Sequence, residues 1–111
     1  MNYSKVYLSV GTNLGNRENN ISNCIDYLEK ISEIKNISKI YETVPYKVQI
    51  EQSNFLNLAL EINFFESAEN LLIEINKIEK ELGRVRSSIR NEPREIDIDI
   101  ILLTDPRSFN Y

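Results

Sequence analysis

The chain has 111 residues, no histidine and one cysteine, and its 13 lysines and arginines against 17 acidic residues give a net charge of −4. The missing histidine excludes a His-based triad and His-ligated zinc, and a single cysteine excludes an internal disulfide. The acidic balance argues against general nucleic-acid binding, so we expect small-molecule ligands and no nucleic-acid partner.

The first strand and the first helix follow from hydrophobic periodicity. Lys5–Val10 alternates apolar and polar residues, which predicts a strand. Gly11–Asn16 is rich in turn residues and predicts a loop, but it lacks the lysine of a Walker A phosphate loop. Asn16 is a good N-cap for the helix that follows, in which Cys24 is expected to be a core residue. The apolar positions of this helix are Ile21, Cys24, Ile25, Leu28 and Ile31.

A polar loop separates the second and third predicted strands. We expect Asn36–Thr43 to be the second strand, Val44–Ser53 the loop and Asn54–Asn63 the third strand. In the third strand, Phe55 and Asn57 lie on the face opposite the leucines. An aromatic ring beside an amide suits a flat heterocycle, which stacks on the ring and hydrogen-bonds to the amide. A second packed face covered by a loop is equally compatible with the pattern.

The second predicted helix has clear start and stop signals. Ser67 is its expected N-cap, and Gly83 is a natural stop. Glu79 lies near the end of this helix, beside an arginine-rich segment, where it is placed to orient an arginine or a ligand. The buried stripe of the helix is predicted to consist of Leu71, Leu72, Ile75, Ile78 and Leu82.

An arginine cluster follows this helix, and it stands out against the acidic composition. Four of the six arginines of the chain fall within eleven residues, namely Arg84, Arg86, Arg90 and Arg94. Guanidinium groups match the oxygens of phosphate in charge and shape. The cluster therefore predicts a phosphate-binding segment.

The last predicted strand carries two acidic residues on one face, Asp97 and Asp99. Its other face is predicted to hold Ile96, Ile98, Ile100 and Leu102. Carboxylates two residues apart on a strand are separated by roughly 6.5 Å, and together they can hold two Mg²⁺ ions and substrate phosphates. A solvated edge strand is the alternative interpretation. The arginines just upstream favour the metal–phosphate site.

The order of the elements predicts an α+β, ferredoxin-like βαββαβ fold, with a four-stranded antiparallel sheet and two helices on one face. If the helices cover the isoleucines and leucines, then Asp97, Asp99, Phe55 and Asn57 all project from the open face. We expect residues 1–111 to form a single domain. The chain has no apolar run long enough for a membrane span and no signal-peptide core, which favours a cytoplasmic protein without membrane contact.

Six blocks of the sequence form a recognisable series: YLSVGTNLGNR (Tyr7–Arg17), SKIYETVP (Ser38–Pro45), QSNFLN (Gln52–Asn57), IE (Ile78–Glu79), GRVR (Gly83–Arg86) and PREIDIDI (Pro93–Ile100). In order and spacing they resemble 6-hydroxymethyl-7,8-dihydropterin pyrophosphokinases, and the final pair, GRVR with PREIDIDI, is the specific part of the resemblance. The resemblance implies a Mg²⁺-dependent enzyme of folate biosynthesis. Such an enzyme transfers diphosphate from ATP to the hydroxymethyl oxygen of the dihydropterin and releases AMP.

The resemblance also implies roles for individual residues. Asp97 and Asp99 match the carboxylates that hold two Mg²⁺ ions, and they count as catalytic together with Arg84 and Arg94. The implied ATP-binding residues are Glu79, Arg84, Arg86, Arg90 and Arg94. The implied pterin-binding residues are Thr43, Pro45, Phe55 and Asn57.

Two other hypotheses remain open at this point. Family members continue well past the fourth strand, whereas this chain stops at Tyr111. The first alternative is therefore a truncated, inactive relative that binds nucleotide or pterin and needs a partner or the missing segment. The second is an RNA-binding module, which is disfavoured because the open face would present two aspartates and only one aromatic ring. The oligomeric state is not determined by the sequence.

Overall fold

Alternating apolar residues build the centre of the sheet from two long strands. The computed structural model describes residues 2–45, 52–83 and 95–104. Strands β1 (Ser4–Thr12) and β4 (Phe55–Phe64) pair antiparallel along the whole length of β1. Every second side chain, such as Leu8 and Leu60, is buried on one face, because successive side chains of a strand point to opposite faces.

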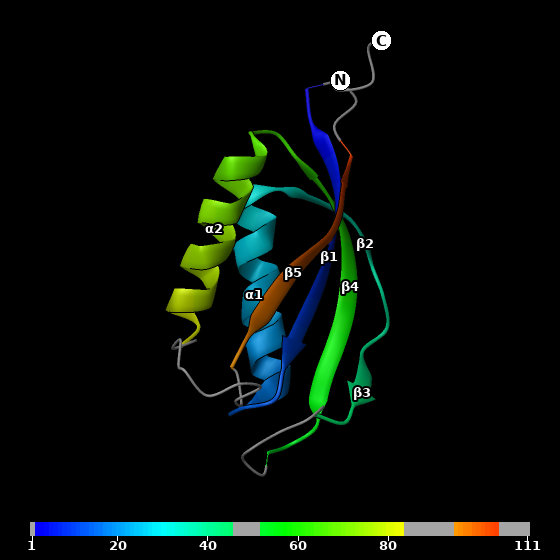
Figure 1. Cartoon of the computed structure of the whole chain (residues 1–111), viewed down its shortest axis with the longest axis vertical. Coiled ribbons are helices and arrows are strands. Elements are labelled where there is room, and N and C mark those ends of the chain that lie inside the picture. Colours follow the sequence, from blue (N-terminus) through cyan, green and yellow to red (C-terminus); the bar gives the residue numbers. More distant parts are fainter. Residues whose placement is uncertain (1, 46–51, 84–94, 105–111) are drawn as a thin grey trace.

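The sheet has the strand order of a ferredoxin-like fold. Strand β5 (Asp97–Thr104) pairs antiparallel with β1, while β2 (Glu33–Ile37) and β3 (Tyr41–Thr43) both pair antiparallel with β4. The order across the sheet is β2-β4-β1-β5, with β3 beside β4 (Figure 1). The α+β, ferredoxin-like architecture predicted from the sequence is therefore confirmed.

The predicted second strand is divided in two. The sequence predicts one strand over Asn36–Thr43, whereas the structure has β2 and β3 as separate short strands. Ser38 lies between them and accounts for the break. Its backbone N–H donates to the carbonyl of Ala59 at 2.9 Å, but the N–H of Ala59 donates to the Ser38 hydroxyl at 2.8 Å. A side chain thus replaces a backbone acceptor in the ladder, and regular pairing stops there.

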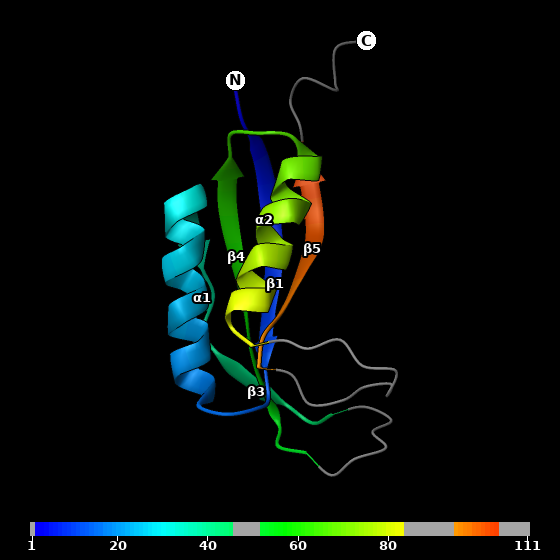
Figure 2. The same cartoon turned by 90° about the vertical axis from the view of Figure 1, so that its left-hand side faces the viewer.

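Helices α1 (Arg17–Ile31) and α2 (Ala68–Glu81) lie side by side on one face of the sheet (Figure 2). Their predicted caps are confirmed. The side chain of Asn16 accepts from the N–H of Asn19 at 3.0 Å, and that of Ser67 accepts from Asn70 at 3.2 Å. Gly83 has a φ of +97°, which suits the glycine that the sequence places just after α2. Within the described residues, no helix is long and apolar enough to cross a membrane.

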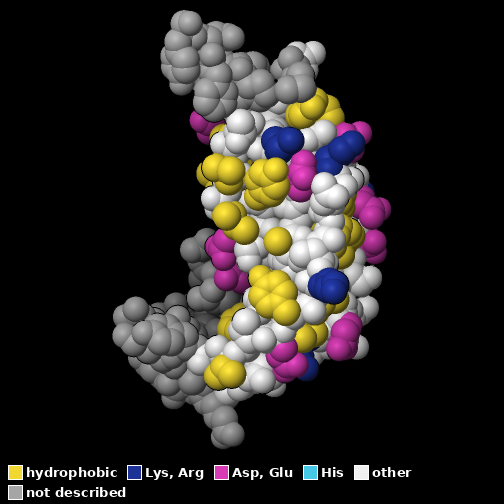
Figure 3. Space-filling model, turned by 90° about the vertical axis from the view of Figure 1, so that its right-hand side faces the viewer, with side chains coloured by type: hydrophobic (Ala, Val, Ile, Leu, Met, Phe, Trp, Pro, Cys, Tyr) yellow, Lys and Arg dark blue, Asp and Glu magenta, His cyan; other side chains and the backbone are white. Residues whose placement is uncertain are grey.

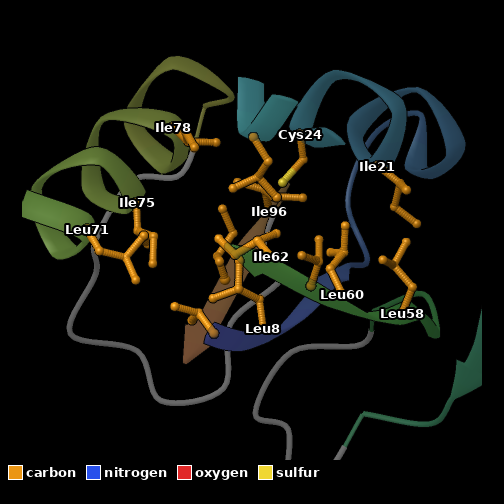
Figure 4. Close-up of a cluster of buried hydrophobic side chains, with 14 of the residues drawn as sticks. Leu8, Ile21, Cys24, Leu58, Leu60, Ile62, Leu71, Ile75, Ile78 and Ile96 are labelled. Atoms are coloured by element: carbon orange, nitrogen blue, oxygen red, sulfur yellow. The ribbon is translucent and has the colours of Figure 1, made fainter. Parts of the chain in front are cut away.

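The core lies between the helices and the sheet (Figure 4). Buried side chains of α1 and α2 meet those of the strands there, and Cys24 is among them, as predicted. Burial raises the pKa of the Cys24 thiol to about 12, and the nearby charge of Glu79 adds to the effect. The prediction that Leu72 belongs to the buried stripe is wrong, because its side chain is 52% exposed. Leu72 follows Leu71, and one residue of helix rotates the side chain by roughly 100° away from the core.

An irregularity in β5 changes which face its second half presents. Leu8 of β1 pairs with Ile100, and Tyr7 pairs with Leu102, so the register skips Ile101. An extra residue in a strand reverses the alternation of side chains beyond it. Leu102 therefore lies opposite Tyr7 on the open face and is 54% exposed, while Leu103 packs against the core. The prediction that Leu102 shares a face with Ile96, Ile98 and Ile100 is wrong for this reason.

Candidate functional site

The candidate site is centred on Gly11, which has Asn57 on one side and Asp97 on the other. Gly11 of β1 pairs directly with Asn57 of β4 and with Asp97 of β5. Residues that pair directly in neighbouring strands point to the same face of the sheet. Asn57 and Asp97 therefore lie on one face, separated by a residue without a side chain. This is the open face, because the neighbours of Gly11 along β1, Val10 above all, point into the core.

Asp99 belongs to the same face, one step further along the sheet. It pairs with Ser9, which in turn pairs with Ala59. Asp97 is half-buried and Asp99 is exposed. Figure 3 shows this face of the molecule, on which acidic side chains lie among hydrophobic ones. The register thus brings the acidic pair to the side of the sheet that carries the amide of Asn57.

The other residues proposed for a heterocycle lie around Asn57. Its Nδ2 donates a hydrogen bond of 2.8 Å to Oγ1 of Thr43 in β3. Thr43 pairs directly with Phe55, so the hydroxyl, the amide and the ring occupy adjoining positions on β3 and β4. Pro45 follows two residues after Thr43 and is half-buried. The side chains of Phe55 and Asn57 are also half-buried, which leaves part of each exposed.

Glu79 approaches the acidic strand from the helical side. Its side chain is 5% exposed, and its Oε2 accepts a hydrogen bond of 3.0 Å from the backbone N–H of Ile98. Ile98 is the residue between Asp97 and Asp99. Among the described strands, β5 lies at the edge of the sheet, so a side-chain acceptor can satisfy backbone donors on its outer side. Glu79 therefore contacts the backbone that carries the two aspartates.

The sequence as a whole can now be compared with known proteins. The sequence model of the 7,8-dihydro-6-hydroxymethylpterin-pyrophosphokinase family matches residues 7–109. The chain belongs to this pyrophosphokinase family. The family resemblance inferred from the motifs is thereby confirmed.

Individual relatives of the pyrophosphokinase family agree with this assignment. The chain is 42% identical over 100 residues to 2-amino-4-hydroxy-6-hydroxymethyldihydropteridine pyrophosphokinase of Aquifex aeolicus, covering 90% of this chain and 61% of that protein. It is 37% identical over 98 residues to the Bacillus subtilis protein of the same name, covering 86% and 58% respectively. A folic acid synthesis protein of Dictyostelium discoideum is 43% identical over 96 residues, which are 86% of this chain and 14% of that protein. The chain thus spans about three fifths of the two pyrophosphokinases it matches.

Two residues of the YLSVGTNLGNR block, Asn13 and Arg17, hold the start of β4 in place. Asn13 is 2% exposed, and its Nδ2 donates to Oε1 of Gln52 at 2.6 Å and to the carbonyl of Ser53 at 3.1 Å. Arg17 donates to the carbonyl of Asn54 at 2.8 Å. These contacts fix the residues that immediately precede Phe55. Sequence reasoning assigned neither side chain a role, and the only signal was their place in the YLSVGTNLGNR block.

The predicted phosphate-binding arginines Arg84, Arg86, Arg90 and Arg94 lie outside the described residues, and their roles stay predictions. The described residues on either side of them are neighbours, however. A side chain at Gly83 would collide with the carboxylate of Glu95. Gly83 at the end of α2 and Glu95, two residues before Asp97, are therefore close in space.

Asp97 and Asp99, the metal ligands that the sequence predicts, lie in the described part of the chain. Within residues 2–45, 52–83 and 95–104, no group of three or more histidine, cysteine or acidic side chains is arranged to hold a metal. A site made entirely by protein ligands is therefore not formed there. Two carboxylates on an accessible sheet face do fit Mg²⁺, which usually binds through one or two carboxylates together with substrate phosphates.

Proposed function

We propose that this chain transfers diphosphate from ATP to the hydroxymethyl oxygen of 6-hydroxymethyl-7,8-dihydropterin, in folate synthesis. One observation carries the proposal: in a member of the pyrophosphokinase family, the acidic residue Asp97 and the amide of Asn57 share the open face on either side of Gly11. A heterocycle bound at Asn57 would thus lie beside the carboxylates that would bind the metal ions and, through them, the phosphates of ATP. The names of the relatives, which include a dihydropteridine pyrophosphokinase and a folic acid synthesis protein, support the same activity.

The pterin is bound by the residues around β3 and β4. Phe55 supplies a ring on which the flat heterocycle stacks, and Asn57 supplies an amide that both donates and accepts. Thr43 orients that amide through its 2.8 Å hydrogen bond, which uses one N–H and leaves the carbonyl oxygen toward β1. Pro45 borders the same site. Such a site would hydrogen-bond to the polar edge of the heterocycle and would orient its hydroxymethyl group toward β5.

The triphosphate of ATP is bound at the acidic strand and the arginine-rich segment. Asp97 and Asp99 would hold two Mg²⁺ ions, which would neutralise charge on the phosphate oxygens. Arg84, Arg86, Arg90 and Arg94 contact the phosphates, and Arg84 and Arg94 stabilise the charge that develops during transfer. Glu79 is buried against the backbone of Ile98, which supports a contribution to ATP binding through the position of β5.

In the reaction, the hydroxymethyl oxygen attacks the β-phosphorus of ATP. A new oxygen–phosphorus bond forms, and the bond from the β-phosphorus to the oxygen that bridges it to the α-phosphorus breaks. AMP leaves with that oxygen, and the hydroxyl proton is released to water. Phosphoryl transfer of this kind depends on positioning and charge stabilisation more than on a strong base, so a chain without histidine is compatible with it.

The test is AMP release from ATP in the presence of Mg²⁺ and the hydroxymethyl dihydropterin. We expect Asp97→Asn and Asp99→Asn to lose at least roughly a hundredfold in rate. Asp26→Asn is the matched control, because Asp26 is an exposed aspartate on α1. Normal turnover in both site variants would overturn the metal assignment. Calorimetry that detects ATP or pterin binding without any AMP release would instead favour the inactive relative.

The remaining expectations about the whole protein stay proposals. ATP and the dihydropterin are its small-molecule substrates, and neither a nucleic acid nor a membrane is expected as a partner. A cytoplasmic location stays a prediction from the sequence.

A further inference from the structure

Gly11 lies inside a strand, where glycine normally lowers stability, so its presence there needs a specific reason. The residue lies inside β1, paired on both sides, although the sequence places it in a loop. Glycine weakens a strand interior, and where it occurs it often marks a site that another group must approach closely. Its backbone does not demand glycine, since the glycines with positive φ in the described residues are Gly15 and Gly83. The side chains packed around Gly11 therefore explain why this position is a glycine.

The space above Gly11 is filled by Asn57 and Phe55. A Cβ atom at position 11 would lie 3.1 Å from Oδ1 of Asn57 and 3.4 Å from Cδ1 of Phe55. The distance to Asn57 is tighter than an ordinary contact, so an alanine would push the amide away by a few tenths of an ångström, whereas the distance to Phe55 is an ordinary van der Waals contact. The amide nitrogen of Asn57 is meanwhile held by Thr43 at 2.8 Å, which restricts how far the amide can yield.

We propose that Gly11 is a positioning residue for the pterin site, because its missing side chain lets the amide of Asn57 lean over β1 toward Asp97, beside the ring of Phe55. The inference rests on the proposed function and deepens it by naming what sets the position of the amide. A heterocycle held by these two groups is thereby aligned with the acidic strand on the far side of Gly11. The residue touches neither the reacting atoms nor the metal site in this role.

The first experiment compares Gly11→Ala with the wild type. We expect the Kd and KM for the pterin to rise by roughly tenfold, because displacements well below 1 Å at a positioning group cost about that much. The Kd for Mg²⁺-ATP should stay within roughly twofold of the wild-type value. Ala59→Ser adds one heavy atom to the same strand face two residues from Asn57 and is expected to change neither constant. Equal losses for both ligands would overturn the proposal, since general damage to the fold acts on both.

A double-mutant cycle tests whether Gly11 acts through the amide. In an Asn57→Ala background the 3.1 Å contact is absent, so Gly11→Ala should cost clearly less pterin affinity than it does in the wild type. Additive losses would contradict the proposal. The double variant also keeps the test available if Gly11→Ala alone does not fold, because the main obstacle to the added methyl group is removed.

A ligand-free measurement separates this inference from the proposed function. The side-chain amide signals of Asn57 in a nitrogen–proton NMR spectrum should shift in Gly11→Ala, while those of Asn36, which lies in β2 and bonds to Glu61, should not. Unshifted Asn57 signals would overturn the inference. Failure of the wild type to bind pterin or release AMP would overturn the proposed function, and the NMR result would still decide the role of Gly11.

Discussion

The carboxylate of Glu79 and the backbone N–H of Ile98 form a buried hydrogen bond of 3.0 Å between α2 and β5. Ile98 carries Asp97 on one side and Asp99 on the other, so this bond fixes the strand segment that presents both aspartates. A carboxylate buried to this degree is costly unless hydrogen bonds satisfy it. The bond therefore links the packing of a helix to the geometry of the candidate site on the opposite face.

Removing this carboxylate should affect both stability and activity. We expect Glu79→Ala to lower the free energy of unfolding by about 1–3 kcal/mol, because the N–H of Ile98 loses its buried acceptor. AMP formation should also fall, whereas Glu79→Gln, which keeps an acceptor oxygen, should retain more of both properties. Urea unfolding and the coupled assay measure the two effects. The control is Glu74→Ala on the same helix, where the removed group forms a partly exposed ion pair with Lys77 at 3.6 Å. Equal effects at positions 74 and 79 would contradict the prediction.

Asn13 should be required for the pterin side of the site rather than the phosphate side. Asn13→Ala removes both hydrogen bonds to Gln52 and Ser53, so the chain before Phe55 loses this anchor and keeps the one from Arg17 to Asn54. We expect a loss of about 1–3 kcal/mol in stability and a weaker pterin affinity, measured by urea unfolding and calorimetry. Asn36→Ala removes an exposed amide that bonds to Glu61 and should be nearly neutral. A pterin affinity that matches the wild type would show that this anchor is dispensable.

Arg94 should contribute chiefly to the rate of transfer. The prediction rests on its place in the PREIDIDI block, directly before the acidic strand. Arg94→Ala is expected to lose roughly a hundredfold or more in kcat, and Arg94→Lys to recover only part, because lysine keeps the charge but not the planar fork. Steady-state AMP formation measures both variants. Lys77→Ala, which removes an exposed cation of α2, serves as the control, and an unchanged kcat in Arg94→Ala would refute the role.

Cys24 should make the fold sensitive to alkaline pH. Burial raises the pKa of its thiol from 9.0 to about 12, so the unfolded chain releases the proton at lower pH than the folded protein. The folded state binds the proton more tightly, and the resulting stability is complete below pH 9 and declines as the pH rises from about 9 to about 12. Urea unfolding across this range should therefore give a steeper decline for the wild type than for Cys24→Ala. Identical slopes would contradict the prediction. Native protein at neutral pH should also react slowly with thiol reagents.

Local patterns in the sequence determined a large part of this structure. Alternating apolar residues defined β1, β4 and β5, and the caps Asn16 and Ser67 defined where the helices begin. The alternation also placed Asp97 and Asp99 on the face opposite Ile96 and Ile98, before any strand pairing was known. These features depend on residues within a few positions of one another, so periodicity and capping chemistry are sufficient to predict them.

The tertiary structure decided the features that depend on pairing between distant segments. Only the register could place Gly11 between Asn57 and Asp97, and only the skipped residue Ile101 could turn Leu102 to the open face. The burial of Glu79 against Ile98 likewise depends on how α2 meets β5. The sequence by itself thus determined which residues alternate and which chemistry they carry. Strand pairing and helix packing decided which of them meet, because contacts between segments tens of residues apart leave no local periodic signal.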